Sequence, residues 1–117
     1  GTRADLLAAL EASATAGDAA ALARAGRALR SAFPKSPAAR RVDALELEWS
    51  RDPTRATQLR RWFAWYELEA ARPATFPAEK GPAAQKYARE LAQHAKQPDA
   101  PGLEQARAWL DAFGRDP

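Results

Sequence analysis

The stretch from Gly17 to Pro37, GDAAALARAGRALRSAFPKSP, holds the signals for a helix with a defined beginning and end. Gly17 suits the left-handed residue that ends one helix, and Asp18 suits the N-cap of the next. Two leucines then recur seven residues apart, which places them on one face of a helix. Pro37 begins a further helix, because proline at the first helical position lacks only an N–H that has no partner there. The stretch therefore predicts a helix over 19–33 between two neighbouring helices.

The same signals recur along the rest of the chain. Asp52-Pro53 and Gly81-Pro82 each pair a suitable cap with proline at the first helical position, and Pro101 is expected to do the same. Strand signals are almost absent, because the chain has one valine, no isoleucine and no lasting polar–apolar alternation. Together these features predict an all-α fold. About six helices are expected, over 3–16, 19–33, 37–50, 53–71, 82–96 and 101–113.

Most of these helices are joined by short turns, which favours three antiparallel hairpins in a stack or bundle. The Gly17-Asp18 turn and the Arg51-Asp52 turn lie 34 residues apart, and each opens the second helix of a hairpin. The first of these second helices resembles that of a tetratricopeptide repeat, in which a Gly-Asp turn precedes small or apolar residues and a proline ends the helix. The matching positions are Gly17, Asp18, Ala19, Leu22, Gly26, Leu29 and Pro34.

This resemblance covers about residues 2–70. The family's first-helix pattern of Trp, Leu-Gly and Tyr is not matched over 3–16, and the third hairpin shares only its helical pattern. The resemblance implies a right-handed stack of hairpins with a shallow groove. A peptide or a partner helix could lie in that groove.

Length and composition bound the kind of protein. At 117 residues we expect a single all-helical domain over 1–117, and the first residue, Gly1 instead of Met, favours a domain cut from a longer protein. No apolar run is long enough to span a membrane and no secretory signal is visible, so we expect no membrane insertion. We expect a soluble protein, with the cytoplasm slightly favoured over the periplasm. The abundance of Ala, Arg and Pro favours a bacterial source.

The segment QLRRWFAWYE, residues 58–67, concentrates four aromatic rings in five positions. On a helix that turns about 100° per residue, five side chains share the face expected to form the core. They are Leu59, Trp62, Phe63, Tyr66 and Ala70. Trp65 and Leu68 fall off that face, so they either pack against the third hairpin or contact a partner. Trp109 lies on the shoulder of its own helix and is expected to be half exposed. The candidate partner-binding residues are therefore Trp65, Leu68 and Trp109.

Arginines form a second candidate surface. Basic residues exceed acidic ones by only three, a mild surplus for a whole domain. Three arginines recur every third residue in the second helix, and others follow nearby, so together they would make a ridge able to hold phosphates. The candidate polyanion contacts are Arg24, Arg27, Arg30, Arg40, Arg41, Arg60 and Arg61. The alternative is a solvated face paired with Asp43, Glu46, Glu48 and Glu67.

Catalytic groups are scarce. The chain has one histidine, His94, and no cysteine, which excludes disulfides and thiol catalysis and leaves too few ligands for an ordinary zinc site. Glu46 and Glu48 are two residues apart, so they point about 200° apart on a helix and cannot share a substrate. His94 is expected at the edge of a core. We therefore expect no enzymatic activity, no cofactor and no metal.

These observations favour a protein–protein interaction module, a scaffold or adaptor that binds a protein or peptide. One alternative is a nucleic-acid-binding helical domain that uses the arginine ridge. The other is a structural accessory domain of a larger enzyme. The segment RPATFPAEKGP, Arg72–Pro82, contains three prolines and is interpreted as a connector, with a specificity loop as the alternative.

Overall fold

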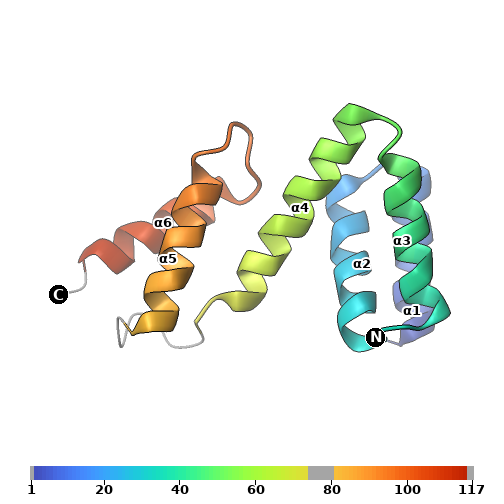
Figure 1. Ribbon diagram of the computed structural model, residues 1–117, viewed down its shortest axis with the longest axis horizontal. Coiled ribbons are helices and arrows are strands. Elements are labelled where there is room, and N and C mark those ends of the chain that lie inside the picture. The colour runs from blue at the N-terminus through green and yellow to red at the C-terminus, as the bar shows by residue number, and fades with distance from the viewer. Residues whose placement is uncertain (1, 74–80, 116–117) are drawn as a thin grey trace. The chain divides into compact units, whose positions relative to one another are not determined.

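The computed structural model describes residues 2–73 and 81–115, and it confirms the all-α fold over these ranges. Six helices are present in the described part of the chain, and no strand is found there. They are α1 (Arg3–Ala16), α2 (Ala19–Ala32), α3 (Pro37–Trp49), α4 (Pro53–Ala71), α5 (Pro82–Ala95) and α6 (Leu103–Arg115), as Figure 1 shows. Most of the Arg72–Pro82 connector, residues 74–80, lies outside the described residues.

The predicted turn between the first two helices has the expected chemistry. Gly17 ends α1 in the left-handed conformation, with φ of 70°, and its N–H donates to the carbonyl oxygen of Ala14. The side chain of Asp18 then accepts a hydrogen bond of 3.1 Å from the N–H of Ala21 at the start of α2. Further along the chain, Asp52 does the same for Thr54, over 3.0 Å, at the start of α4. Both aspartates thus satisfy backbone donors that have no partner within the helix.

The last helix begins later than predicted. α6 starts at Leu103 instead of position 101 and extends to Arg115. Asp99 and Gly102 both have positive φ, 58° and 69°, so the chain makes a tight turn before the helix begins. Pro101 belongs to that turn, and the first carbonyl to accept a helical hydrogen bond is that of Gly102. The left-handed residue Gly102 thus delays the start of the helix to Leu103, although Pro101 predicted an earlier start.

The chain divides into two compact units, residues 1–66 and 67–117. The first unit contains α1, α2, α3 and the part of α4 up to Tyr66. The second contains the remainder of α4 with α5 and α6. The prediction of a single domain stays a prediction.

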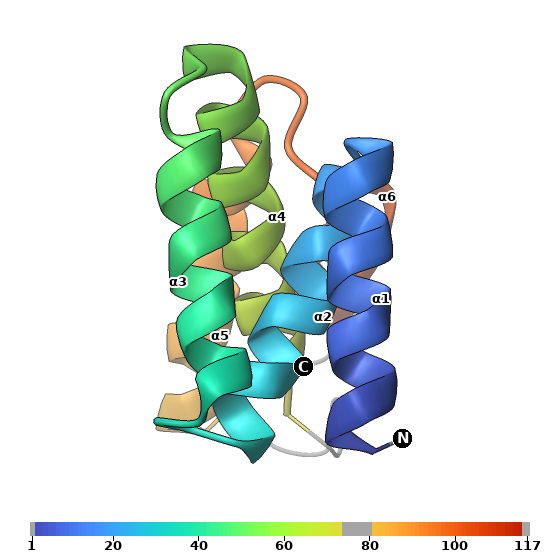
Figure 2. The same ribbon diagram turned by 90° about the vertical axis from the view of Figure 1, so that its right-hand side faces the viewer.

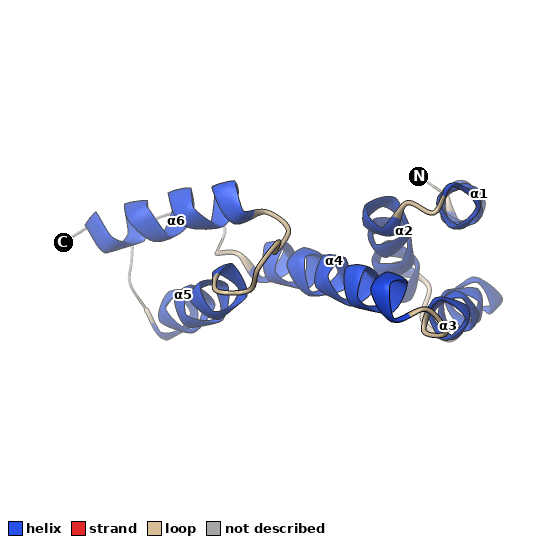
Figure 3. Ribbon diagram, turned by 90° about the horizontal axis from the view of Figure 1, so that it is seen from above, coloured by secondary structure: helices blue, strands red, loops and turns tan. Residues whose placement is uncertain are grey.

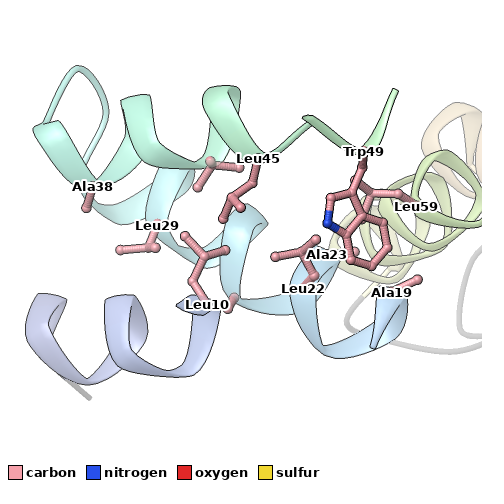
Figure 4. Packing of buried hydrophobic residues seen from close by; sticks show 11 residues of the cluster. Leu10, Ala19, Leu22, Ala23, Leu29, Ala38, Leu45, Trp49 and Leu59 are labelled. Atoms are coloured by element: carbon pink, nitrogen blue, oxygen red, sulfur yellow. The ribbon is translucent and has the colours of Figure 1, made fainter. Parts of the chain in front are cut away.

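In the first unit, α3 packs against both α1 and α2, and the three helices occupy the corners of a triangle when viewed nearly end-on in Figure 3. Figure 2 shows the same helices from the side, with α4 following α3 after a short turn. Their inner faces hold one apolar core, in which Leu10, Leu29 and Val42 are almost fully buried. Leu59 brings α4 into that core, so four helices contribute side chains to it (Figure 4).

At Gly26 the helices of this core approach each other closely. A Cβ atom at this position would lie 3.0 Å from Cγ1 of Val42 on α3 and 3.1 Å from Cζ of Phe63 on α4. Such distances are shorter than ordinary van der Waals contacts between carbon atoms. The missing side chain at Gly26 therefore lets α3 and α4 pack against the middle of α2.

The second unit has its own buried residues. Leu91 of α5 is fully buried, and Tyr87 meets Trp109 of α6 edge to face with ring centroids 4.8 Å apart. His94 is also buried, with 4% of its surface exposed, deeper than the core edge that its spacing indicated. Its Nε2 lies 2.8 Å from the carbonyl oxygen of Pro101. Because a carbonyl oxygen can only accept, Nε2 must carry the hydrogen, and the bond fastens the turn before α6 to α5.

Candidate functional site

The aromatic segment of α4 is mainly structural. Leu59 is buried, and Trp62, Phe63 and Tyr66 are half-buried against the core of the first unit, as their common helical face predicted. Ala70 was expected on the same face and is exposed. Ala70 belongs to the second unit. The helical spacing that predicts core positions therefore continues into a part of α4 that is not part of the first unit.

Trp65 is one of the three candidate partner-binding residues, and only 5% of its surface is exposed. An indole as deeply buried as this has little surface left for a partner, so its burial agrees with the structural interpretation and not with an exposed anchor. Leu68, the second candidate, is half-buried. Helical periodicity left both interpretations of Trp65 open because it identifies one apolar face and does not show what covers the rest of the helix.

Trp109, the third candidate, is half-buried, as predicted from its position on the shoulder of α6. Its ring stacks on that of Phe113, with centroids 5.0 Å apart and an angle of 14° between the planes. Leu110 and Phe113 are half-buried as well. We name Trp109, Leu110 and Phe113 the α6 aromatic ledge. The three side chains lie within about 100° of each other around the helix, so they form one continuous apolar strip.

The arginines of the predicted ridge divide into different environments. Arg30 on α2 is held by two carboxylates of α3, with Nη2 2.5 Å from Oδ1 of Asp43 and also bonded to Glu46. Burial lowers the pKa of Arg30, but these hydrogen bonds outweigh it and raise the pKa above its ordinary value. Its charge is therefore largely neutralised within the fold. This pairing is the one that the solvated-face alternative predicts.

Arg41 is neutralised in a similar way. Its Nε and Nη2 donate to the two carboxylate oxygens of Glu11 over 2.6 Å and 2.9 Å, which makes a bidentate ion pair between α3 and α1. Arg40 donates to the backbone carbonyl of Lys35 over 3.0 Å. Because these arginines are engaged with α1 and with the α2–α3 connection, they do not extend the surface made by the arginines of α2 and α4.

The other four candidates stay on α2 and α4. The guanidinium of Arg24 lies over the ring of Tyr66, 5.2 Å from its centroid, and Arg24 is exposed. Arg60 is exposed and its neighbour Arg61 is half-buried. Arg27 is half-buried. Because consecutive residues differ by about 100° around a helix, Arg60 and Arg61 project from different sides of α4.

The bidentate pair between Glu11 and Arg41 makes stability depend on pH. The hydrogen bond from Arg41 holds the pKa of Glu11 below its ordinary value of 4.5. A carboxylate whose pKa is lowered by folding stabilises the fold above the unfolded pKa, and this contribution is lost as pH falls through the folded pKa. Both side chains are more than one third exposed, so the contribution is small, about 0–1 kcal/mol.

We therefore expect Glu11→Gln to lower the free energy of unfolding by up to about 1 kcal/mol at pH 7, and by nothing once pH falls below the folded pKa of Glu11. Urea unfolding at a series of pH values measures the difference. Arg41→Gln supplies the control, because Glu11→Gln should have no further effect in that background. A difference between the two proteins that stays constant from pH 7 to pH 2 would contradict this assignment.

Other kinds of site receive little support from the described residues. Over residues 2–73 and 81–115, no three of the side chains of His, Asp and Glu gather in a way that could hold a metal ion. In the same ranges, no helix combines the length and the hydrophobicity that crossing a bilayer requires.

The sequence did not indicate Leu47 on α3 as a candidate residue. It is 66% exposed, and a single exposed leucine is ordinary on a protein surface.

Comparison of the chain with protein-family models, with curated proteins and with solved structures finds no match. The resemblance of residues 17–34 to a tetratricopeptide helix therefore stays a prediction.

Proposed function

We propose that the chain is a protein–protein interaction module, a scaffold or adaptor without catalytic activity of its own. The observation that carries this proposal is the α6 aromatic ledge. It presents two stacked rings and a leucine that are each only half-buried. A few residues supply most of the binding energy in protein interfaces, and tryptophan is enriched among them. An amphipathic helix or an apolar peptide segment is the partner that fits such a strip.

The charge of the second unit supports a protein partner over a polyanion. Its described residues, 67–73 and 81–115, contain six basic and six acidic side chains, so these residues carry no net positive charge that would attract phosphates. Two acidic residues, Glu104 and Asp111, lie on the same helix as the ledge. Binding at the ledge would therefore depend on apolar contact, with a weak dependence on salt.

Site-specific photo-crosslinking tests the proposal. A benzophenone amino acid at position 110 samples the ledge, and the same amino acid at position 104, exposed on the opposite side of α6, serves as the matched control. After irradiation in the native cells, we expect discrete protein adducts from position 110 and none of them from position 104. With the adduct partner identified and purified, Trp109→Ala should weaken its binding by about 2 kcal/mol, which is roughly thirtyfold.

Several outcomes would reject the proposal. Equal adducts from both positions would show a non-specific surface. Adducts removed by nuclease would show that the partner is a nucleic acid. Binding of the purified partner that is unchanged by Trp109→Ala, in a variant whose thermal unfolding shows an intact fold, would remove the ledge as the contact.

A further inference from the structure

The positive charge of the chain is concentrated on two helices of the first unit. The described residues of this unit, 2–66, carry eleven basic and seven acidic side chains, whereas those of the second unit balance. Within the first unit, α2 and the part of α4 up to Tyr66 contain six arginines and no aspartate or glutamate. The remaining segments of the unit hold more acidic than basic residues. The six arginines are Arg24, Arg27, Arg30, Arg55, Arg60 and Arg61.

The two helices that carry these arginines are neighbours in the fold. Arg24 lies over the ring of Tyr66 on α4, and Arg30 lies 5.4 Å from the ring centroid of Phe63 on the same helix. The Cβ position of Gly26 comes within 3.1 Å of Phe63. Arg30 is neutralised by α3 and does not contribute to a binding charge. Arg24, Arg60 and Arg61 give this part of the unit a positive surplus, because α2 and the part of α4 up to Tyr66 carry no carboxylate. Glu67 and Glu69 follow on α4 beyond Tyr66.

Two aromatic rings accompany this charge. Trp62 and Tyr66 are half-buried on α4, with ring centroids 5.7 Å apart and an angle of 32° between their planes. The exposed guanidinium of Arg24 lies 5.2 Å from the centroid of Tyr66. Aromatic rings next to arginine are the elements from which proteins build platforms for single-stranded nucleic acid, since the rings stack on bases and the cations contact phosphates.

From this arrangement we propose that the surface formed by Arg24, Arg61, Trp62 and Tyr66 binds single-stranded nucleic acid. We name it the α2–α4 basic face. A single strand fits better than a duplex, because the bases of a duplex are already stacked on each other and cannot reach a protein ring. Arg61 lies about 100° from Trp62 around α4, whereas Arg60 lies about 160° from Trp62 and is not part of this face. The face lies in the first unit and shares no residue with the α6 aromatic ledge.

Fluorescence anisotropy of a labelled 15-nucleotide oligo-dT, titrated with the full 117-residue chain at low salt, tests the proposal. We expect saturable binding whose affinity falls with salt. Contacts to two phosphates correspond to a slope of about −1.4 in the plot of log K against log salt, at about 0.7 for each phosphate. Arg24→Glu should weaken binding about tenfold and reduce the slope by about 0.7. Arg24→Lys should retain most of the affinity.

Arg107→Glu is the matched control for charge. It makes the same change of two charge units at an exposed arginine, but on α6 of the second unit. We expect its effect on binding to be less than twofold. Equal losses from Arg24→Glu and Arg107→Glu would show that only the net charge matters, and this result would overturn the proposal.

The rings are tested with Trp62→Leu and Tyr66→Leu, which keep apolar side chains against the core. Each should weaken binding of the oligonucleotide about tenfold without changing the salt slope, because stacking contributes no phosphate contact. Thermal unfolding shows whether each variant keeps its fold, and Trp62→Phe, which keeps a ring, should bind as the parent does. Unchanged affinity in folded Trp62→Leu and Tyr66→Leu proteins would reject the platform.

Three further results would overturn the proposal. They are failure to bind the oligonucleotide at 20 mM salt, equal affinity for a duplex of the same length, and binding to anionic vesicles alone. Trp109→Ala distinguishes this proposal from the proposed function. It should leave oligonucleotide binding unchanged, so loss of the protein partner and loss of nucleic acid can be observed separately.

Discussion

Replacing Trp65 with alanine should lower the free energy of unfolding by about 3–5 kcal/mol, the range for truncating a buried tryptophan. The side chain is 5% exposed although it lies off the helical face shared by Leu59 and Phe63. Alanine would remove the whole indole and leave a space that the surroundings can fill only in part. A protein of this size has a total stability of about 5–15 kcal/mol, so the variant should lose much of its resistance to denaturant.

Chemical denaturation followed by far-ultraviolet circular dichroism measures this effect. Gln58→Ala, at an exposed position on the same helix, is the control and should change stability by less than about 0.5 kcal/mol. If the midpoint for Trp65→Ala equals that of the parent, the indole is not part of the packed structure. Its interpretation as a partner contact would then have to be restored.

Leu29→Ala should have an effect of similar size, a loss of about 3–5 kcal/mol. Leu29 has no exposed surface and lies in the core that joins α1, α2, α3 and α4 (Figure 4). Close packing on all sides limits how far the neighbours can move into the cavity, which places the cost in the upper part of the range for Leu→Ala substitutions.

The chain provides its own control for that experiment. Leu47→Ala is the same substitution at a leucine that is 66% exposed. It should alter the free energy of unfolding by no more than about 0.5 kcal/mol. Urea unfolding of both variants compares the two leucines directly. Because alanine is a better helix former than leucine, helix propensity predicts no loss for either variant. Similar losses for both would show that the cost does not depend on burial and would contradict the prediction.

The helix boundaries could be predicted from the sequence because their signals are local. Thr2 and Asp5 form a capping box at the start of α1, with hydrogen bonds of 3.2 Å and 3.3 Å, and both residue types are ordinary signals for such a cap. Pro37, Pro53 and Pro82 each begin a helix as expected. A cap or a first-turn proline acts within four residues, so the identity of its neighbours is enough to assign it.

The candidate sites were harder to predict because they depend on residues far apart in the sequence. Arg41 and Glu11 are 30 residues apart and meet only after α1 and α3 pack. The pairing of Arg30 with Asp43 likewise requires α2 and α3 to be in place. A list of arginines therefore cannot distinguish those that are neutralised from those that remain exposed. The burial of Trp65 was equally hard to predict, because a helical wheel contains no information about the elements that pack beside the helix.

The close approach at Gly26 has a consequence for how this sequence can change. Cγ1 of Val42 and Cζ of Phe63 would lie 3.0 Å and 3.1 Å from any Cβ atom added at position 26. A larger residue there is compatible with the fold only if position 42 or position 63 becomes smaller at the same time. The three positions thus form a coupled set across three helices. In descendants of this chain they should be substituted together, while exposed residues of α2 such as Ser31 are free to vary one at a time.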